Sequence, residues 1–91
     1  MKFSSPVFQF RLWDGHSIGP DALKRMWSAA CDHEKVVVSR TWVGTNHSGN
    51  PEYLYSLYPP TLVFNRTLAE SRMVLFLRAR YPSMPVVLQR L

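Results

Sequence analysis

Cysteine, acidic side chains and long apolar runs are scarce in this chain. The 91 residues include one cysteine, Cys31, which excludes an intramolecular disulfide framework and fits a reducing compartment. No stretch reaches the roughly 18 apolar residues of a membrane helix, and the polar and charged residues that soon follow the N-terminus are not typical of a signal peptide. We therefore expect a soluble, cytoplasmic protein with no membrane partner.

Acidic residues are scarce above all in the C-terminal half. Residues 53–91 hold five arginines and one acid, Glu70, whereas residues 1–52 nearly balance six basic against five acidic side chains. The net charge of +5 therefore comes mostly from the C-terminal half. Guanidinium groups pair with phosphate and carboxylate and stack on planar rings. This charge distribution favours nucleic acid or an acidic protein surface as the partner.

Motifs for catalysis, metal ligation or cofactor binding are missing as well. His16, His33 and His47 lie far apart, and none has a histidine partner at helical spacing. Cys31 and His33 lie too close together at a helix end to converge on one ion, and a zinc site needs four ligands in a wider pattern. We expect no bound metal and no cofactor, and we interpret Cys31 as a small buried hydrophobe.

Apolar residues, by contrast, are plentiful enough for a core. A chain of this length forms one domain, residues 1–91, because chains usually divide only above roughly 250 residues. Hydrophobic residues make up 46% of the chain, yet so small a domain is only marginally stable. Dimerisation or partner binding would bury more surface, so a homodimer is one expectation.

Alternation of apolar and polar side chains predicts the strands. In residues 7–13 it places Phe8, Phe10 and Leu12 inward, and Asp14 with Gly15 ends this strand as a turn. Residues 35–43 and 53–58 predict a hairpin joined by the loop 44–51, because their side chains are β-branched, aromatic or alternating. Residues 86–88 fit a closing strand, and residues 62–64 are a further short candidate.

Helical spacing and end signals predict two helices. Pro20 and Asp21 suit the first turn of a helix over residues 20–31, whose apolar side chains recur at helical spacing. Thr67 and Glu70 form a capping box, which predicts a second helix over residues 68–80 that Pro82 ends. The unbroken apolar run at residues 73–77 would also fit a buried strand.

The order strand, helix, strand, strand, helix, strand is that of the ferredoxin-like split βαβ fold, an α+β architecture whose antiparallel sheet carries both helices on one face. The other sheet face is then open, and single-stranded RNA is one frequent guest there. The predicted core consists of Phe8, Phe10, Leu23, Met26, Trp27, Ala30, Val36, Val38, Leu77 and Val87.

Tyr53 and Tyr55 are the first candidate binding residues. At positions i and i+2 of a strand they point to one face, where two rings could each stack a base at about 1 to 3 kcal/mol per base. Arg40 on the adjacent predicted strand would complete a cationic platform. The alternative is that both rings pack in the core, since the glycine of the RNA-recognition signature is absent.

Arg72, Arg78 and Arg80 are the second group of candidates. On the second predicted helix they would contact phosphates and give an affinity that weakens steeply with salt. Helical-wheel angles place them on different sides, so they do not predict one compact patch. The alternative is a solvated helix face whose aliphatic stems cover apolar neighbours.

These features favour a non-enzymatic binding protein that docks Arg40, Tyr53, Tyr55, Arg72, Arg78 and Arg80 on single-stranded RNA or DNA. A second hypothesis is an inhibitor or adaptor, of the type found in viruses and mobile elements, that occupies a surface of a nucleic-acid-handling complex. Arginines and aromatic residues are enriched in such interfaces, and Trp13 and Trp42 are open candidates while Trp27 fits the core. A small ribonuclease using His47, Tyr53 and Arg40 is the enzymatic alternative.

Overall fold

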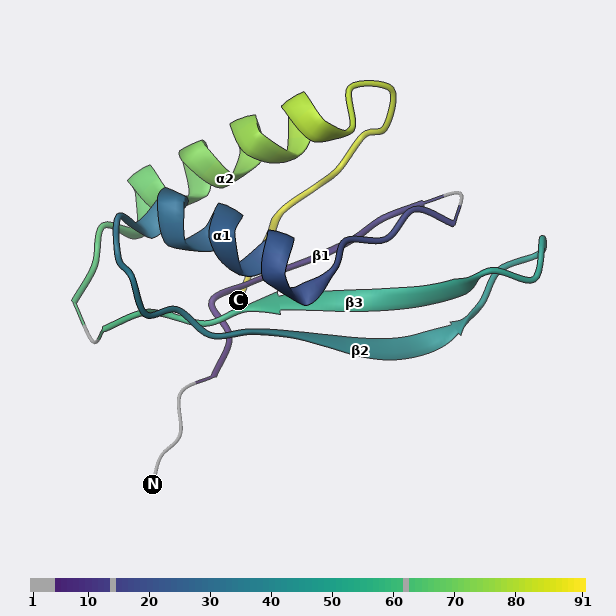
Figure 1. The fold of residues 1–91 in the computed structure, drawn as a ribbon, viewed down its shortest axis with the longest axis horizontal. Helices are drawn as coiled ribbons and strands as arrows, with labels where there is room; N and C mark the ends of the chain where they lie inside the picture. Colours follow the sequence, from purple (N-terminus) through teal and green to yellow (C-terminus); the bar gives the residue numbers. More distant parts are fainter. Residues whose placement is uncertain (1–4, 14, 62) are drawn as a thin grey trace.

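The computed structural model describes residues 5–13, 15–61 and 63–91. These residues form β1 (Phe8–Arg11), α1 (Pro20–Cys31), β2 (Val38–Thr45), β3 (Pro51–Leu57), α2 (Arg66–Arg80) and β4 (Gln89–Arg90). The strands form one antiparallel sheet in the order β2-β3-β1-β4. Figure 1 shows both helices over the same face of this sheet. The predicted α+β class, with an antiparallel sheet and two helices, is confirmed.

Strand β1 follows the predicted alternation. Phe8, Phe10 and Leu12 are buried, and β1 pairs with β3 on one side and β4 on the other. Gly15 has a positive φ of 75°, as a turn requires, while Asp14 of the same predicted turn lies outside the described residues. Leu62 of the predicted short strand also lies outside them, and residues 63 and 64 are not in a strand.

Helix α1 has the predicted bounds. Gly19 precedes it, Pro20 occupies its first turn, and Asp32 ends it in the left-handed conformation at φ 54°. Leu23, Trp27 and Ala30 are buried, and the Trp27 indole N–H donates to the Tyr58 carbonyl at 2.8 Å. The helix is thereby fixed to the segment that follows β3.

Helix α2 resolves the ambiguity at residues 73–77 in favour of a helix. Ala69, Met73 and Leu77 recur every four residues and are buried, because this stripe packs against α1 and the core. The predicted capping box is wrong: the helix begins at Arg66, and Asn65 caps it by accepting the Leu68 N–H at 3.0 Å. Neither helix of the described chain is long and apolar enough to cross a membrane.

Strands β2 and β3 form a hairpin whose tip extends past the N-terminal end of α1 (Figure 1). β2 begins three residues later than predicted and continues to Thr45, with a bulge between Trp42 and Gly44. The last part of the hairpin therefore has no helix above it, and β2 is an edge strand of the sheet.

The C-terminal strand is shifted toward the end of the chain. β4 covers Gln89 and Arg90 instead of residues 86–88, and Val87, expected in the core, is 74% exposed. Met26 and Val38 are half-buried against the core, and the other predicted core residues are buried.

An ion pair connects β4 to α2. Arg90 donates to both carboxylate oxygens of Glu70, with Nε–O distances of 2.9 Å. This hydrogen bond holds the pKa of the Glu70 carboxyl below its ordinary value. The pair therefore stabilises the fold above the carboxyl's unfolded-state pKa, and its contribution is lost as pH falls through the lower folded-state pKa.

Candidate functional site

Tyr55 lies in the core and not on a binding surface. Its side chain is 1% exposed, its ring stacks on Phe10 with centroids 5.0 Å apart, and its hydroxyl accepts the Ile18 N–H at 3.1 Å. Because side chains alternate along a strand, Tyr53 points to the same helix-covered face. The predicted platform of two stacking rings is therefore wrong for Tyr55, and the alternative of core packing holds.

Tyr53 has a different environment because it lies nearer the tip of the hairpin, beyond the N-terminal end of α1. Its ring is half-buried and 6.3 Å from that of Tyr55, and the Arg40 guanidinium lies 4.1 Å from its centroid. Trp42 pairs directly with Tyr53 across the two strands and is 62% exposed. Arg40, Trp42 and Tyr53 form the hairpin cluster, in which the predicted neighbours Arg40 and Tyr53 are in contact.

The hairpin cluster is cationic. β2 contains no acid, and Glu52 of β3 alternates to the opposite face from Tyr53. An exposed cation–π contact contributes only about 0.5 to 1 kcal/mol. Arg40 can therefore leave the Tyr53 ring for a ligand at small cost, while Trp42 offers a ring that is already accessible.

The arginines of α2 do not join this cluster. Arg72 is half-buried, and Arg78 and Arg80 are exposed. Arg78 lines a hollow with Glu70 and Leu75, whereas Arg80 lies beside Tyr81 at the C-terminal end of the helix. Figure 1 shows α2 on the far side of α1 from β2, so these side chains and Arg40 belong to separate surfaces.

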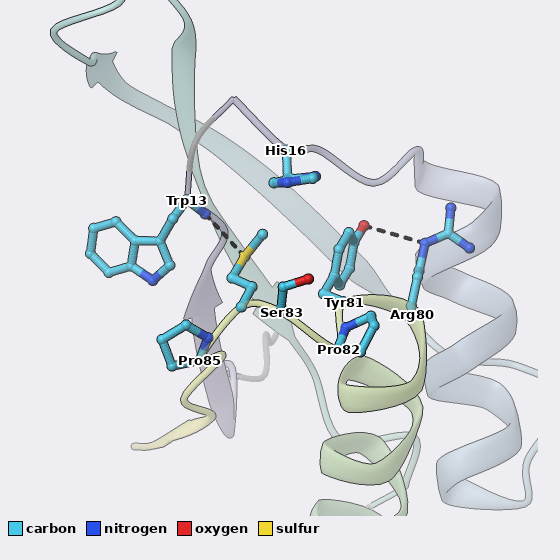
Figure 2. Close-up of a pocket in the computed structure, with 8 residues that line it drawn as sticks. Trp13, His16, Arg80, Tyr81, Pro82, Ser83 and Pro85 are labelled. Carbon is cyan, nitrogen blue, oxygen red and sulfur yellow. Dashed lines mark hydrogen bonds between the residues drawn. The ribbon is translucent and has the colours of Figure 1, made fainter.

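A second group of exposed aromatic and basic residues surrounds a hollow beside Trp13. The hollow has a volume of about 530 Å³ and is lined by Trp13, His16, Arg80, Tyr81, Met84 and Pro85, among others. Figure 2 shows Trp13 and Arg80 at opposite sides of it, with His16 and Tyr81 between them. We call it the Trp13 hollow, because Trp13 is 50% exposed beside it.

The open face of the sheet lacks the expected stacking surface. Its central positions carry one cation, Arg11 of β1, and otherwise small, amide or aliphatic side chains, and the Gln9 amide donates to the Ser56 hydroxyl at 3.1 Å. Rings stand at its two ends, where Trp13 follows β1 and Tyr58 follows β3. These central positions are Gln9, Arg11, Ser39, Thr41, Leu54 and Ser56.

The residues of the ribonuclease alternative are not assembled. His47 lines a separate hollow with Trp13 and Glu52, on the side of the hairpin opposite to Tyr53. No side-chain hydrogen bond of His47 is present in the described part of the chain. Among the described residues, His47, Tyr53 and Arg40 therefore do not form the paired acid and base that this alternative requires.

Metal ligands do not converge in the structure as described: no three His, Cys, Asp or Glu side chains form a group. Cys31, at the end of α1, is half-buried. Burial raises the pKa of its thiol to about 12, so the thiol stays protonated at neutral pH and is a poor nucleophile and metal ligand.

Comparisons of the chain with protein-family models, curated proteins and solved structures gave no match. The functional argument therefore depends on the geometry. Sequence reasoning identified Arg40 and Tyr53 but left Trp42 open, although its i+2 spacing from Arg40 on one strand was a usable signal. The grouping of Trp13, His16 and Arg80 had no local signal, because it depends on loops that meet only in the folded chain.

Proposed function

We propose that the protein is a small non-enzymatic module that binds single-stranded nucleic acid through the hairpin cluster. The observation that carries this proposal is the contact of Arg40 with Tyr53 beside the exposed ring of Trp42. Rings and guanidinium planes both stack on unpaired bases, and the same guanidinium pairs with phosphate. A single strand exposes base faces that a duplex hides, so single strands are the favoured ligand.

The α2 arginines contribute to this proposal at longer range. Arg72, Arg78 and Arg80 lie on a separate surface, so one short strand does not have to contact them and Arg40 together. They add to the net charge of +5, which attracts a polyanion before contact. Salt screens this attraction and weakens it. In this proposal charge brings the strand to the protein, and the hairpin cluster holds its bases.

We also propose that the fold is ferredoxin-like. The element order and the antiparallel pairing of all four strands support this assignment. An experimentally determined structure in which β1 pairs with neither β3 nor β4 would contradict it.

Substitutions in the hairpin cluster test the proposed function by titration of a labelled ten-nucleotide oligo-dT strand. Trp42→Ala and Tyr53→Ala should each weaken binding by about 1 to 3 kcal/mol without changing the salt dependence, because each removes a stacking ring. Arg40→Gln should reduce the slope of log affinity against log salt by about 0.7, the value for one phosphate contact on a single strand.

Two controls accompany this test. Tyr53→Phe should keep most of the affinity, because the ring stacks without its hydroxyl. Thr41→Ala changes the neighbouring residue on the opposite face of β2 and should bind like the parent. A folded Trp42→Ala variant that binds oligo-dT as tightly as the parent would refute the proposed function.

A protein-binding inhibitor or adaptor is the second candidate, favoured by the exposed edge of β2. Edge strands offer unpaired backbone groups to an added strand, and Trp42, Val43 and nearby Val37 are exposed along this edge. The partner would be an acidic protein surface, given the charge of the chain. Failure of any oligonucleotide to bind at low salt would favour this candidate.

A further inference from the structure

Arg80 is held in place at the rim of the Trp13 hollow. Its Nε donates to the Tyr81 hydroxyl at 3.3 Å, and that hydroxyl donates to the Ser17 carbonyl at 3.3 Å. Within the described residues, neither terminal amino group of Arg80 has a hydrogen-bond partner or an ion pair. Among these residues the guanidinium therefore keeps both terminal amino groups available to donate, beside an Nε that is already held, and such paired donors bind phosphate or carboxylate.

Aromatic rings lie beside the Arg80 guanidinium. The His16 imidazole meets the Tyr81 ring edge to face, with centroids 5.6 Å apart. Trp13 lies across the hollow, on the side of Pro85 (Figure 2), and its backbone N–H contacts the Met84 sulfur at 3.3 Å. Tyr81 is almost fully buried, so this wall is part of the folded core. The volume of about 530 Å³ is in the usual range for small-molecule sites, roughly 300 to 1,000 Å³.

The Trp13 hollow attracts an anion mainly through one side chain, that of Arg80. The described lining residues include Arg80 and His16 but no acid. The C-terminal carbonyls of α2 have a partial negative charge that opposes an anion at this place. Arg80 must therefore supply most of the attraction, and its removal should nearly abolish binding.

We propose that the Trp13 hollow binds a phosphate monoester attached to a nucleoside, with the phosphate on Arg80 and the base against the ring of His16 or Trp13. A monoester has about two negative charges and three acceptor oxygens, whereas an internal phosphodiester of a strand has one charge. A single guanidinium fork therefore favours a phosphorylated end. The inference rests on the proposed function for its choice of nucleic acid as the ligand.

Two sources could supply this chemistry, a free nucleotide and the phosphorylated end of a strand. The probes are therefore AMP and three oligo-dT strands of ten nucleotides, with a phosphate at the 5′ end, at the 3′ end or at neither. Proton–nitrogen NMR spectra should show AMP shifting the Trp13 indole and His16 signals. At least one phosphorylated strand should bind about tenfold more tightly than the unphosphorylated strand.

Arg80→Gln should reduce AMP affinity at least tenfold and abolish the preference for a phosphorylated end. Arg25→Gln removes the same charge at an exposed site on α1 and is the matched control. It should keep both the AMP affinity and the preference for a phosphorylated end. Arg80→Lys should recover only part of the affinity, because the ammonium lacks the fork. Equal AMP affinity in the parent and Arg80→Gln would overturn the inference.

The outcomes separate this inference from the proposed function. Strand binding that requires Trp42 but ignores terminal phosphate would overturn the inference and leave the proposed function standing. AMP binding at Trp13 and His16 without any binding of single strands would support the inferred phosphate monoester site and refute the proposed function. If an acidic proline-containing peptide shifts the NMR signals of Trp13 and His16 and AMP does not, the inference is overturned in favour of a peptide site.

Discussion

At the scale of single residues, Tyr55 shows how one hydroxyl connects the sheet to the start of α1. Its ring fills space against Phe10, and its oxygen accepts the backbone N–H of Ile18, which lies just before the helix. Ile18 is itself buried, so its N–H has little access to water. A buried donor without a partner loses the hydration that the unfolded chain provides, and the tyrosine hydroxyl prevents that loss.

Tyr55→Phe should lower the free energy of unfolding by about 1 to 3 kcal/mol, because the ring remains and the Ile18 N–H loses its acceptor. Tyr53→Phe is the matched change, and it should alter stability by less than about 0.5 kcal/mol, since its ring is only half-buried. Urea denaturation followed by circular dichroism measures both. Identical midpoints for the two variants would contradict the role assigned to the Tyr55 hydroxyl.

At the scale of elements, α2 illustrates how a helix start is chosen. Both Asn65 and Thr67 are good capping residues, and the Glu70 side chain three residues after Thr67 fits a capping box. In the structure Glu70 is bound by Arg90 instead, and Asn65 accepts the Leu68 N–H. The long-range ion pair and the earlier cap together place the helix start at Arg66.

Asn65→Ala should therefore destabilise the protein by about 1 kcal/mol, the typical cost of a lost N-cap. Thr67→Ala should be close to neutral, because Thr67 lies inside the first turn, is exposed, and alanine has a higher helix propensity. Thermal unfolding of the two variants beside the parent gives the comparison. A larger loss in Thr67→Ala than in Asn65→Ala would restore the capping box.

At the scale of the whole molecule, two helices cover part of one sheet face and leave the end of the hairpin uncovered (Figure 1). The core lies under the helices, where α1, α2, β1 and β3 meet. The hairpin cluster and the Trp13 hollow both lie at margins of this packed region. Stability and the proposed binding therefore depend on largely separate residues.

Leu23→Ala and Val87→Ala test the extent of the core. Leu23 is fully buried, so its truncation should cost about 2 to 5 kcal/mol, a large part of the stability of a domain this small. Val87 is exposed, so its truncation should change stability by less than about 0.5 kcal/mol. Calorimetric unfolding of both variants measures this. A comparable loss in Val87→Ala would place residue 87 in the core after all.

The sequence by itself determined the α+β class, the inward face of β1, the bounds of α1 and the contact between Arg40 and Tyr53. These features follow from local periodicity and turn residues, which act within one or two neighbouring elements. The two-residue alternation of side chains along a strand also showed that Tyr53 and Tyr55 share a face of the sheet. It could not show which face the helices cover, because that choice depends on how the whole sheet packs.

Only the tertiary structure decided which aromatic residues are accessible. Tyr55 is buried and Trp42 is exposed because α1 begins between their positions along the hairpin and covers only Tyr55. Val87 is exposed because β4 begins two residues after it. The Trp13 hollow exists because the segment after β1 lies against the segment after α2, as the contact of the Trp13 N–H with the Met84 sulfur shows. Such contacts join residues distant in the chain, and no local pattern encodes them.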